Sequence, residues 1–387
     1  MEFSLNSEQK LLEDNVRKFA QREVAPLAAT IDREARFPVE NFKKMGEMGL
    51  LGITVPQAWG GAGGTYLDMM IATEELAAAC TSTAVAFAAN ATLFNDNVVH
   101  NGSETIKRKY LPGTSAGDLI GGIAMTEPDT GSDVVSMRTS ARREGDYYVL
   151  NGTKILITNG PIGDVFIVYA KTDPLQGSNG ISAFVVEATF PGFRRGKTFA
   201  KLGWRGSPTG ELVFEDCLVP AENLLGSLNR GIVVLMSGLN SERVVMGALS
   251  VGLARGAYEA ALRYAQERHQ FGQPLVAFQL IQEKLVTIAM HLEMARLLVY
   301  KGAVLMDGGH RGRQANLVAS YAKLFASEMC MAATTEAVQI LGGYGFTQDY
   351  PVERMMRDAK IHTIGGGTSE IQKMIIMRAL LEGPQLD

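Results

Sequence analysis

Cysteine is scarce in this sequence, and basic residues never form long runs. The only three cysteines, Cys80, Cys217 and Cys330, lie far apart along the 387 residues. This spacing argues against a disulfide framework and against the clustered ligands of a zinc site, so we expect three small buried hydrophobic residues and no bound metal. The net charge is −4, and the densest basic cluster is only three residues long (107–109). We therefore expect no nucleic-acid binding.

Long apolar segments are also missing. The stretch from Thr83 to Ala91 is interrupted by Asn90 and is too short to span a bilayer. The first residues, from Met1 to Leu5, lack the basic and then apolar pattern of a signal peptide. Because 46% of the residues are hydrophobic and 20% are charged, a sizeable globular core is expected. We predict no membrane insertion, and a cytoplasmic protein or the mature form of a mitochondrial matrix protein.

The sequence pattern divides the chain into three segments. Residues 1–119 show helical periodicity, with Ser7 as a candidate N-cap, Pro38 opening a further helix, and Ser103 capping a helix that should end before Pro112. Residues 120–229 contain short β-rich runs bounded by glycine, proline and aspartate, and Asn151-Gly152 predicts a hairpin turn.

Residues 230–387 contain two long stretches without proline, Ile232–Arg268 and Val276–Gln348, which predict long helices of a bundle. The fold class that follows is α+β. It has an N-terminal all-α domain (1–119), a central antiparallel β-barrel or sandwich (120–229) and a C-terminal four-helix bundle (230–387).

Two glycine-containing segments are candidates for ligand contact. Gly365-Gly366-Gly367 precedes a helix that starts at Thr368 and Glu370, where free N–H groups favour a phosphate or a carbonyl group. Met125 to Ser132 carries two hydroxyl groups and Gly131, and turns of this kind can present several N–H groups to one ligand. On residue chemistry alone, an ordinary Pro/Gly/Asp turn remains an alternative for the second segment.

Both segments resemble signatures of the acyl-CoA dehydrogenase family, and the resemblance extends along essentially the whole chain. It includes Lys154–Gly160, Glu267–Gly272 with Gln279, and Gln339–Phe346. It implies FAD as cofactor, an acyl-CoA substrate, an electron-transferring flavoprotein as partner, and a homotetramer whose subunits share the flavin. The implied cofactor contacts are Met125, Thr126, Gly131, Ser132, Leu156, Thr158, Arg268, Phe271, Gln279, Gln339, Gly343, Thr368 and Glu370. Leu156 stands where the family usually has a tryptophan beside the flavin. Arg268 suits a pyrophosphate, although read alone it is a helix-end cation.

The catalytic base is the main departure from the family pattern. Many members read Tyr-Glu-Gly-Thr near the C-terminus and use that glutamate as the base, whereas this chain has Gly365 and Gly366 there. Glu242, which precedes Arg243 on a predicted helix with apolar flanks, matches the base of the isovaleryl-CoA branch. A buried glutamate there would have a raised pKa, suited to proton abstraction. A solvated Glu-Arg step is the alternative.

The resemblance also assigns substrate contacts, namely Ser132, Asn240, Arg243, Gly366 and Gly367, with the Gly366 N–H as a donor to the thioester oxygen. Missing side chains at 365 and 366 widen the site and favour a short branched or cyclic acyl group. Asp96 is a second candidate base, acting at a more remote carbon, or a hydrogen-bonded aspartate near a helix end. Three further interpretations stay open. The chain could be a dehydrogenase of a cyclic or aromatic-substituted acyl-CoA, of the cyclohexanecarboxyl, cyclohexenecarboxyl or benzylsuccinyl type, in anaerobic degradation. It could also be an oxygen-using oxidase, or a non-catalytic or nucleic-acid-associated helical relative.

Overall fold

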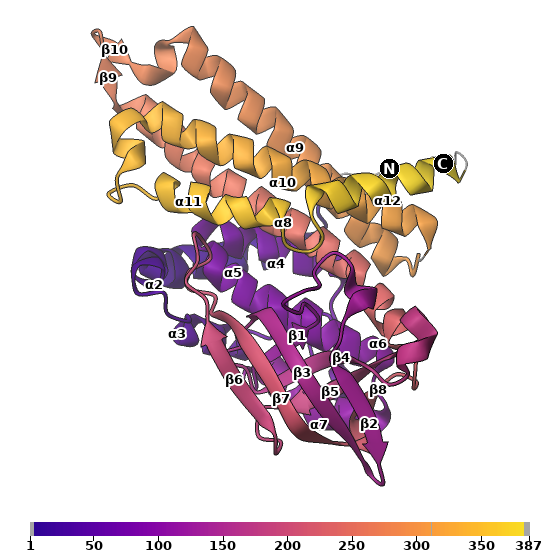
Figure 1. Cartoon of the computed structure of the whole chain (residues 1–387). Coiled ribbons are helices and arrows are strands. Elements are labelled where there is room, and N and C mark those ends of the chain that lie inside the picture. The colour runs from indigo at the N-terminus through magenta and orange to yellow at the C-terminus, as the bar shows by residue number, and fades with distance from the viewer. Residues whose placement is uncertain (1–3, 311, 383–387) are drawn as a thin grey trace.

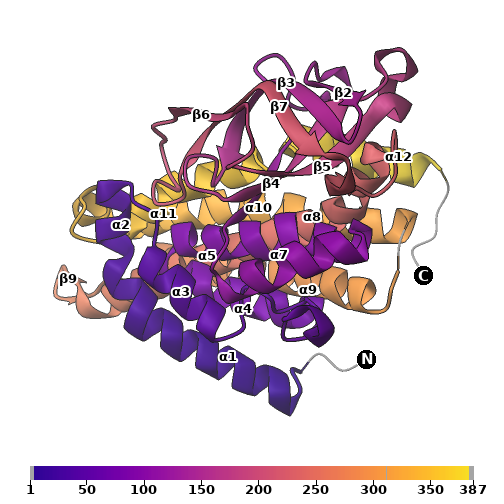
Figure 2. The ribbon, with the colours of Figure 1, turned by 90° about the horizontal axis from the view of Figure 1, so that it is seen from below.

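The computed structural model describes residues 4–310 and 312–382, so the prediction for the first three residues lies outside it. A helical N-terminal part and the long C-terminal helices form one helical body, and a sheet domain packs against it (Figure 1, Figure 2). The predicted α+β class, with a central β domain between two helical ones, is confirmed.

The N-terminal part consists of α1 (Ser7–Phe19), α2 (Ala28–Glu34), α3 (Val39–Glu47), α4 (Tyr66–Ala79), α5 (Thr81–Ala88), α6 (Asn97–Asn101) and α7 (Glu104–Ala116). Asn6, not the predicted Ser7, caps α1, because its side chain accepts from the Gln9 N–H and the Gln9 side chain accepts from the Asn6 N–H. Ser103 caps α7 as predicted, but the helix continues through Pro112 and ends at Gly117.

The sheet domain comprises β1 (Gly121–Ala124), β2 (Ser140–Glu144), β3 (Tyr147–Thr158), β4 (Val165–Lys171), β5 (Ile181–Glu187), β6 (Phe193–Thr198), β7 (Thr209–Pro220) and β8 (Leu224–Leu225). Its order is β6-β7-β3-β2-β4-β5-β8, with β1 on β4. Most neighbours are antiparallel, but β1 and β2 each pair with β4 in parallel.

The predicted Asn151-Gly152 hairpin is wrong, because both residues lie inside the continuous strand β3. Gly152 marks a change of register against β7, and a Cβ there would lie 2.8 Å from Thr139 Cα. Close approach of two backbones, rather than a turn, requires this glycine. The turn that joins β2 to β3 lies at Gly145 instead.

The C-terminal part contains α8 (Gly231–Glu267), α9 (Gln279–Asp307), α10 (Arg313–Leu341), α11 (Val352–Ala359) and α12 (Ser369–Leu381), with the short strands β9 (His269–Gln270) and β10 (Gln273–Pro274) between α8 and α9. One helix of the described chain, α8, is long and apolar enough to cross a bilayer, but 61% of its most apolar window is buried within the fold, as in the core helix of a globular domain.

A shared core joins the N-terminal and C-terminal helices. Buried side chains of α4, such as Met69 and Leu76, belong to the same hydrophobic cluster as Leu249 of α8 and Ala326 of α10. The three cysteines are buried and free, as expected. Since α8 packs on α4, on α10 and on the sheet domain, the side chains along its first turns lie where the three parts meet.

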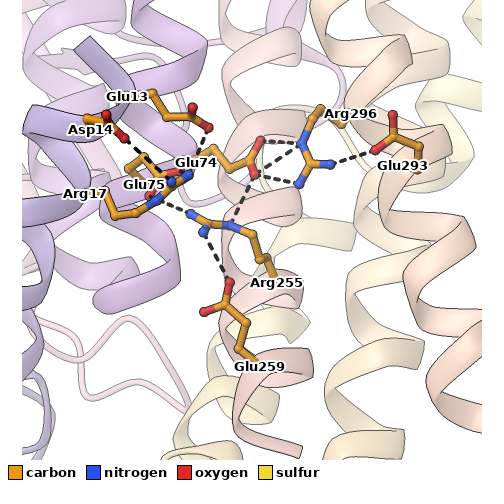
Figure 3. A network of polar contacts seen from close by, with 9 residues as sticks. All are labelled: Glu13, Asp14, Arg17, Glu74, Glu75, Arg255, Glu259, Glu293 and Arg296. Carbon is orange, nitrogen blue, oxygen red and sulfur yellow. Dashed lines mark hydrogen bonds and ion pairs between the residues drawn. The ribbon is translucent and has the colours of Figure 1, made fainter. Parts of the chain in front are cut away.

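An ion-pair network reinforces this junction (Figure 3). Glu74 and Glu75 of α4 are buried, and their carboxylates pair with Arg17 of α1, Arg255 of α8 and Arg296 of α9. Arg357 of α11 pairs with Asp32 and Glu353, so α11 also has a structural ion pair with the N-terminal helices.

Candidate active site

Glu242 lies on the face of α8 that turns toward the glycine segment before α12. A Cβ at Gly366 would lie 3.7 Å from Glu242 Oε1 and 3.1 Å from Met246 Cγ. The structure therefore brings together the proposed base and the position that carries it in most family signatures. Burial raises the pKa of Glu242, while the positive charges of Arg243 and Lys323 lower it in part. A carboxylate with a raised pKa is suited to taking up a proton from a weak carbon acid.

Tyr169 of β4 is the sheet-domain side chain that is influenced by the charge of this carboxylate, and in the described structure its buried hydroxyl has no hydrogen-bond partner. Burial, and then the charge of Glu242, raise the pKa of Tyr169, so its hydroxyl stays protonated. In the parallel pairing of β1 with β4, Ala124 lies opposite Val168, so Met125 emerges beside Tyr169. Tyr169, Met125 and Leu239 of α8 belong to one hydrophobic cluster. The turn that starts at Met125 thus reaches the same face of α8 as Glu242.

The 365–367 turn is held in a conformation that favours glycine. Gly366 and Gly367 have φ of 64° and 85°, which L side chains rarely adopt. Their carbonyl oxygens accept hydrogen bonds from Gln372 Nε2, and Lys323 Nζ donates to the Gly367 oxygen at 2.6 Å. Among the described residues, the N–H groups of Gly366 and Gly367 meet no acceptor. They are available to a ligand oxygen.

Arg243 and Asn240 lie on the buried part of α8. The Arg243 guanidinium donates to Asn240 Oδ1 at 3.3 Å, and its buried Nε has no partner in the described structure. Burial lowers the pKa of Arg243, and the nearby Glu242 charge opposes that effect. A buried guanidinium with an unpartnered donor is costly unless a ligand completes its hydrogen bonds. Asn240 also lines a cavity of about 320 Å³ with Ser237 and Ser241.

A buried ion pair shapes the turn that follows β1. Lys154 Nζ lies 2.7 Å from Glu127 Oε1 and donates to the Met125 carbonyl at 3.1 Å. Glu127 also accepts from the N–H groups of Arg138 and Thr139. Burial lowers the pKa of Lys154 to about 8, and the Glu127 charge opposes this. The pair fixes the backbone from which Met125 and Thr126 are presented.

The second predicted flavin segment lies directly beside this turn. The Ile155 N–H donates to the Thr126 carbonyl at 2.8 Å, which places Leu156 next to Thr126. Thr158 lies further along β3, where its oxygen would be 3.1 Å from a Cβ at Gly122. Leu156 is 55% exposed and has φ of 58°, an unusual conformation for a leucine. A Cβ at Gly131 would meet no atom within 4 Å. The open space at Gly131 and the exposed apolar side chain of Leu156, on a strained backbone, suit a surface that binds a flat ring system.

The start of α12 completes this side of the site. The Thr368 hydroxyl caps the helix by accepting from the Ile371 N–H. The N–H at the helix start and the Thr368 hydroxyl lower the pKa of the exposed Glu370. Thr368 therefore has a structural role that is independent of any cofactor.

Five predicted cofactor residues lie elsewhere: Arg268, Phe271, Gln279, Gln339 and Gly343. The strands β9 and β10, which carry Phe271, stand at the end of the bundle remote from α12 (Figure 1, Figure 2). Phe271 is 93% exposed, and a Cβ at Gly343 would meet no atom within 4 Å. Within a single chain, these five residues therefore do not lie near Glu242.

Asp96 has hydrogen-bond partners of its own. Its carboxylate accepts from the Tyr66 hydroxyl at 2.5 Å and from Ser241 Oγ at 2.7 Å, and His100 Nε2 lies 3.4 Å away. Ser241 and Glu242 are adjacent on α8 and point about 100° apart. The geometry favours the interpretation of Asp96 as a hydrogen-bonded aspartate, held by hydroxyl groups near a helix end.

The comparisons with known proteins identify the family of the chain. Family models for the N-terminal, middle and C-terminal domains of acyl-CoA dehydrogenases match residues 6–118, 122–217 and 229–381. The chain belongs to the acyl-CoA dehydrogenase family. Its members catalyse flavin-dependent dehydrogenation of acyl-CoA, with FAD as the cofactor, so this acyl-CoA dehydrogenase is a flavoprotein oxidoreductase.

Two curated relatives illustrate the range of substrates. The chain is 46% identical over 376 residues to a short-chain specific acyl-CoA dehydrogenase of Clostridium acetobutylicum, covering 97% of this chain and 98% of the relative. It is 43% identical over 378 residues to the mitochondrial isovaleryl-CoA dehydrogenase of Oryza sativa subsp. japonica, covering 97% and 91%.

Two solved structures share the fold. A chain from work on the electron-transferring flavoprotein of Acidaminococcus fermentans matches with a TM-score of 0.97 and 41% identity, covering 99% of this chain and 100% of that one. The FAD complex of PigA matches with a TM-score of 0.94 and 32% identity, covering 99% and 100%.

Four side chains that shape the site were not singled out by the sequence pattern. Lys323 and Gln372 hold the glycine turn, and the Lys154–Glu127 pair holds the turn after β1. A lysine within an apolar stretch of α10 gave a weak signal for Lys323, because such a lysine is rarely buried without a reason.

Proposed function

We propose that Glu242 is the base that removes the α proton of a short branched or cyclic acyl-CoA. The observation that carries this proposal is the contact between Glu242 and the empty side-chain position at Gly366. FAD, when bound, would supply the acceptor for the hydride of the β carbon. A Glu242 oxygen would take up the α proton, and loss of this proton and of the hydride would leave the 2,3 double bond.

The glycine turn and Arg243 would support this proton transfer. Free N–H groups at Gly366 and Gly367 are placed to donate to the thioester oxygen, where negative charge develops as the α proton leaves. The partly unsatisfied Arg243 guanidinium, with Asn240, adds positive charge and donors on the same helix. Ser132 is proposed as a further substrate contact at the exposed end of its turn.

The acyl group would be accommodated where Gly365 and Gly366 have no side chains. A Cβ at Gly365 would lie 3.8 Å from Ile361 Cγ1 and 4.0 Å from Met246 Cε, with the Ile361 oxygen at 3.6 Å, so two of its three nearest neighbours are apolar. Space close to the α and β carbons favours branching or a ring over a long straight chain.

The shared cofactor site supports a homotetramer. Exposed apolar side chains follow one face of α9, at intervals of three, four and seven residues: Val286, Met290, Met294, Leu297 and Val304. A contiguous apolar helix face of this kind suits a second copy of the chain. We propose that Arg268, Phe271, Gln279, Gln339 and Gly343 contact the FAD of a neighbouring subunit. We also propose an electron-transferring flavoprotein as acceptor, and the cytoplasm or mitochondrial matrix as location.

Flavin bleaching under anaerobic conditions tests the function. The purified yellow protein is mixed with isovaleryl-, isobutyryl-, butyryl-, octanoyl- and cyclohexanecarboxyl-CoA, and we expect the fastest reduction with a branched or cyclic substrate. Glu242→Gln with full FAD content should abolish reduction, whereas Glu259→Gln, an exposed glutamate on the same helix, should leave it unchanged. Near wild-type reduction by Glu242→Gln would show that another group is the base.

A further inference from the structure

Lys323 of α10 is a fully buried lysine that no carboxylate contacts within ion-pair distance in the described chain. An ammonium group has three donors and is strongly disfavoured in the protein interior unless it is compensated. The hydrogen bond found for it goes to the Gly367 carbonyl, at 2.6 Å. Burial lowers the pKa of Lys323 to about 8, and the charge of Glu242 is the largest influence that opposes this. Its position therefore relates it to the glycine turn and to the base.

Gln372 of α12 holds the same turn from the other side. Its Nε2 donates to the carbonyl oxygens of Gly366 and Gly367, each at 3.2 Å, and the side chain is fully buried. In a trans peptide the C=O and the following N–H point in opposite directions. Fixing the Gly366 carbonyl therefore fixes the direction of the Gly367 N–H. Gln372 thus sets the direction of the Gly367 N–H, and Lys323 and Gln372 together set that of the following N–H, at Thr368.

On the basis of the proposed function, we propose that Lys323 is a positioning residue for the dehydrogenation, which holds the 366–367 turn against Glu242 and places a positive charge beside that carboxylate. Gln372 stabilises the same turn through uncharged hydrogen bonds. The two side chains differ in charge but share an acceptor, so their contributions can be separated by experiment.

The charged and titratable groups around Glu242 define the expected pH effect. Arg243 of α8 and Lys323 of α10 are positive, and Tyr169 of β4 stays neutral. Burial lowers the pKa of the neighbouring His362 to about 3, so it also stays neutral. Glu370 and Glu328 act on Lys323 from further out. Loss of the Lys323 charge removes one of the two positive charges that lower the pKa of Glu242 against the effect of burial.

The test is the pH profile of flavin reduction by the best acyl-CoA, with Lys323→Gln, Lys323→Met and Gln372→Leu. Lys323→Gln keeps a donor but loses the charge, and we expect the acid limb to move up by about one pH unit, which is about tenfold slower reduction at a fixed pH on that limb. Lys323→Met should show the same shift and a lower plateau. Gln372→Leu should lower the plateau without moving the limb. Lys373→Met, which removes an exposed lysine of α12, serves as the matched control and should change neither.

Hydrogen exchange gives a readout that does not depend on turnover. The peptide that contains residues 364–368 should exchange faster in Lys323→Met and Gln372→Leu than in wild type and Lys373→Met. An unmoved acid limb in Lys323→Gln would overturn the proposal. An equal shift in Gln372→Leu would do the same, because the shift would then come from loosening of the turn. If none of the acyl-CoA substrates reduces the flavin of the wild-type protein, the proposed function fails. Faster exchange in the variants would still show that Lys323 and Gln372 stabilise the turn.

Discussion

Replacement of Glu74 by glutamine should weaken the junction between the N-terminal helices and the bundle. The Glu74 carboxylate lies 2.8 Å from Arg296 Nη2 and 3.2 Å from Arg255 Nε, and its side chain is only 7% exposed (Figure 3). Glutamine keeps the shape but removes the charge and turns an NH₂ group toward a guanidinium. Two partly buried arginines then lose a shared partner.

The size of the effect follows from the partners that remain. Breaking a buried ion pair by removing one charge costs about 3–5 kcal/mol. Arg255 keeps Glu75 at 2.9 Å, and Arg296 keeps Glu293 at 2.8 Å. We therefore expect the lower end of that range, about 3 kcal/mol of unfolding free energy. Glu293, the outer partner of Arg296, has a side chain that is 62% exposed. Glu293→Gln should therefore lower the free energy of unfolding by less than about 1 kcal/mol.

Urea unfolding followed by circular dichroism measures both variants against wild type, with midpoints compared at matched m-values. A double variant of Glu74→Gln with Arg296→Met should lose less than the sum of the two single losses, because the guanidinium that lost its buried partner is gone. The reasoning is refuted if Glu74→Gln and Glu293→Gln have equal costs, since burial would then make no difference.

Three further changes test other parts of the structure. Burial, aided by the Lys323 charge, lowers the pKa of His362 to about 3, compared with about 6.5 in the unfolded chain. Between these two pH values the unfolded chain binds more protons than the folded one. The stability of the fold therefore falls as the pH drops from about 6.5 to about 3. His362→Asn should flatten that fall by about 1.4 kcal/mol per pH unit in urea titrations between pH 4 and 6; an unchanged slope would contradict it. Gly367→Ala would place Cβ 2.7 Å from Gln372 Nε2 at φ of 85°, and should cost at least about 1 kcal/mol in the same assay; a neutral effect would argue against the constrained turn. Lys154→Met leaves the Glu127 carboxylate buried without its cation and should reduce the FAD-to-protein ratio after gel filtration, and an unchanged ratio would show that the pair does not organise the flavin turn.

The division into helices, sheet and helices was predictable because the spacing of hydrophobic residues in the sequence indicates which face of a helix or strand is buried. The long proline-free stretches became α8, α9 and α10, and the β-rich runs became the sheet. The hairpin at Asn151-Gly152 failed for a physical reason. A glycine serves equally for a turn and for close approach between strands, and local sequence does not distinguish the two.

The candidate site was predictable only in part. Resemblance to the family pointed to Glu242 and to the turns at 125–132 and 365–367, but their proximity needed the packing of α8 against the sheet and α12. Lys323 stands 81 residues after Glu242 in the sequence, and a single lysine is normally a solvated charge. Its importance lies in burial and in its hydrogen bond to Gly367, which only the folded chain shows.

The absence of a side chain at Gly366 and the presence of Glu242 have the same electrostatic reason: the site can hold only one ionised carboxylate. A glutamate at 366 would begin 3.7 Å from the Glu242 oxygen, in surroundings that already raise the pKa of Glu242 by burial. Two carboxylates so close cannot both stay ionised in a desolvated site, and one of them would hold a proton and fail as a base. The site therefore accommodates a single carboxylate, and either α8 or the turn before α12 can supply it. Arg243 and Lys323 provide positive charge for one carboxylate in this position, so the triple glycine is compatible with a complete proton-transfer site.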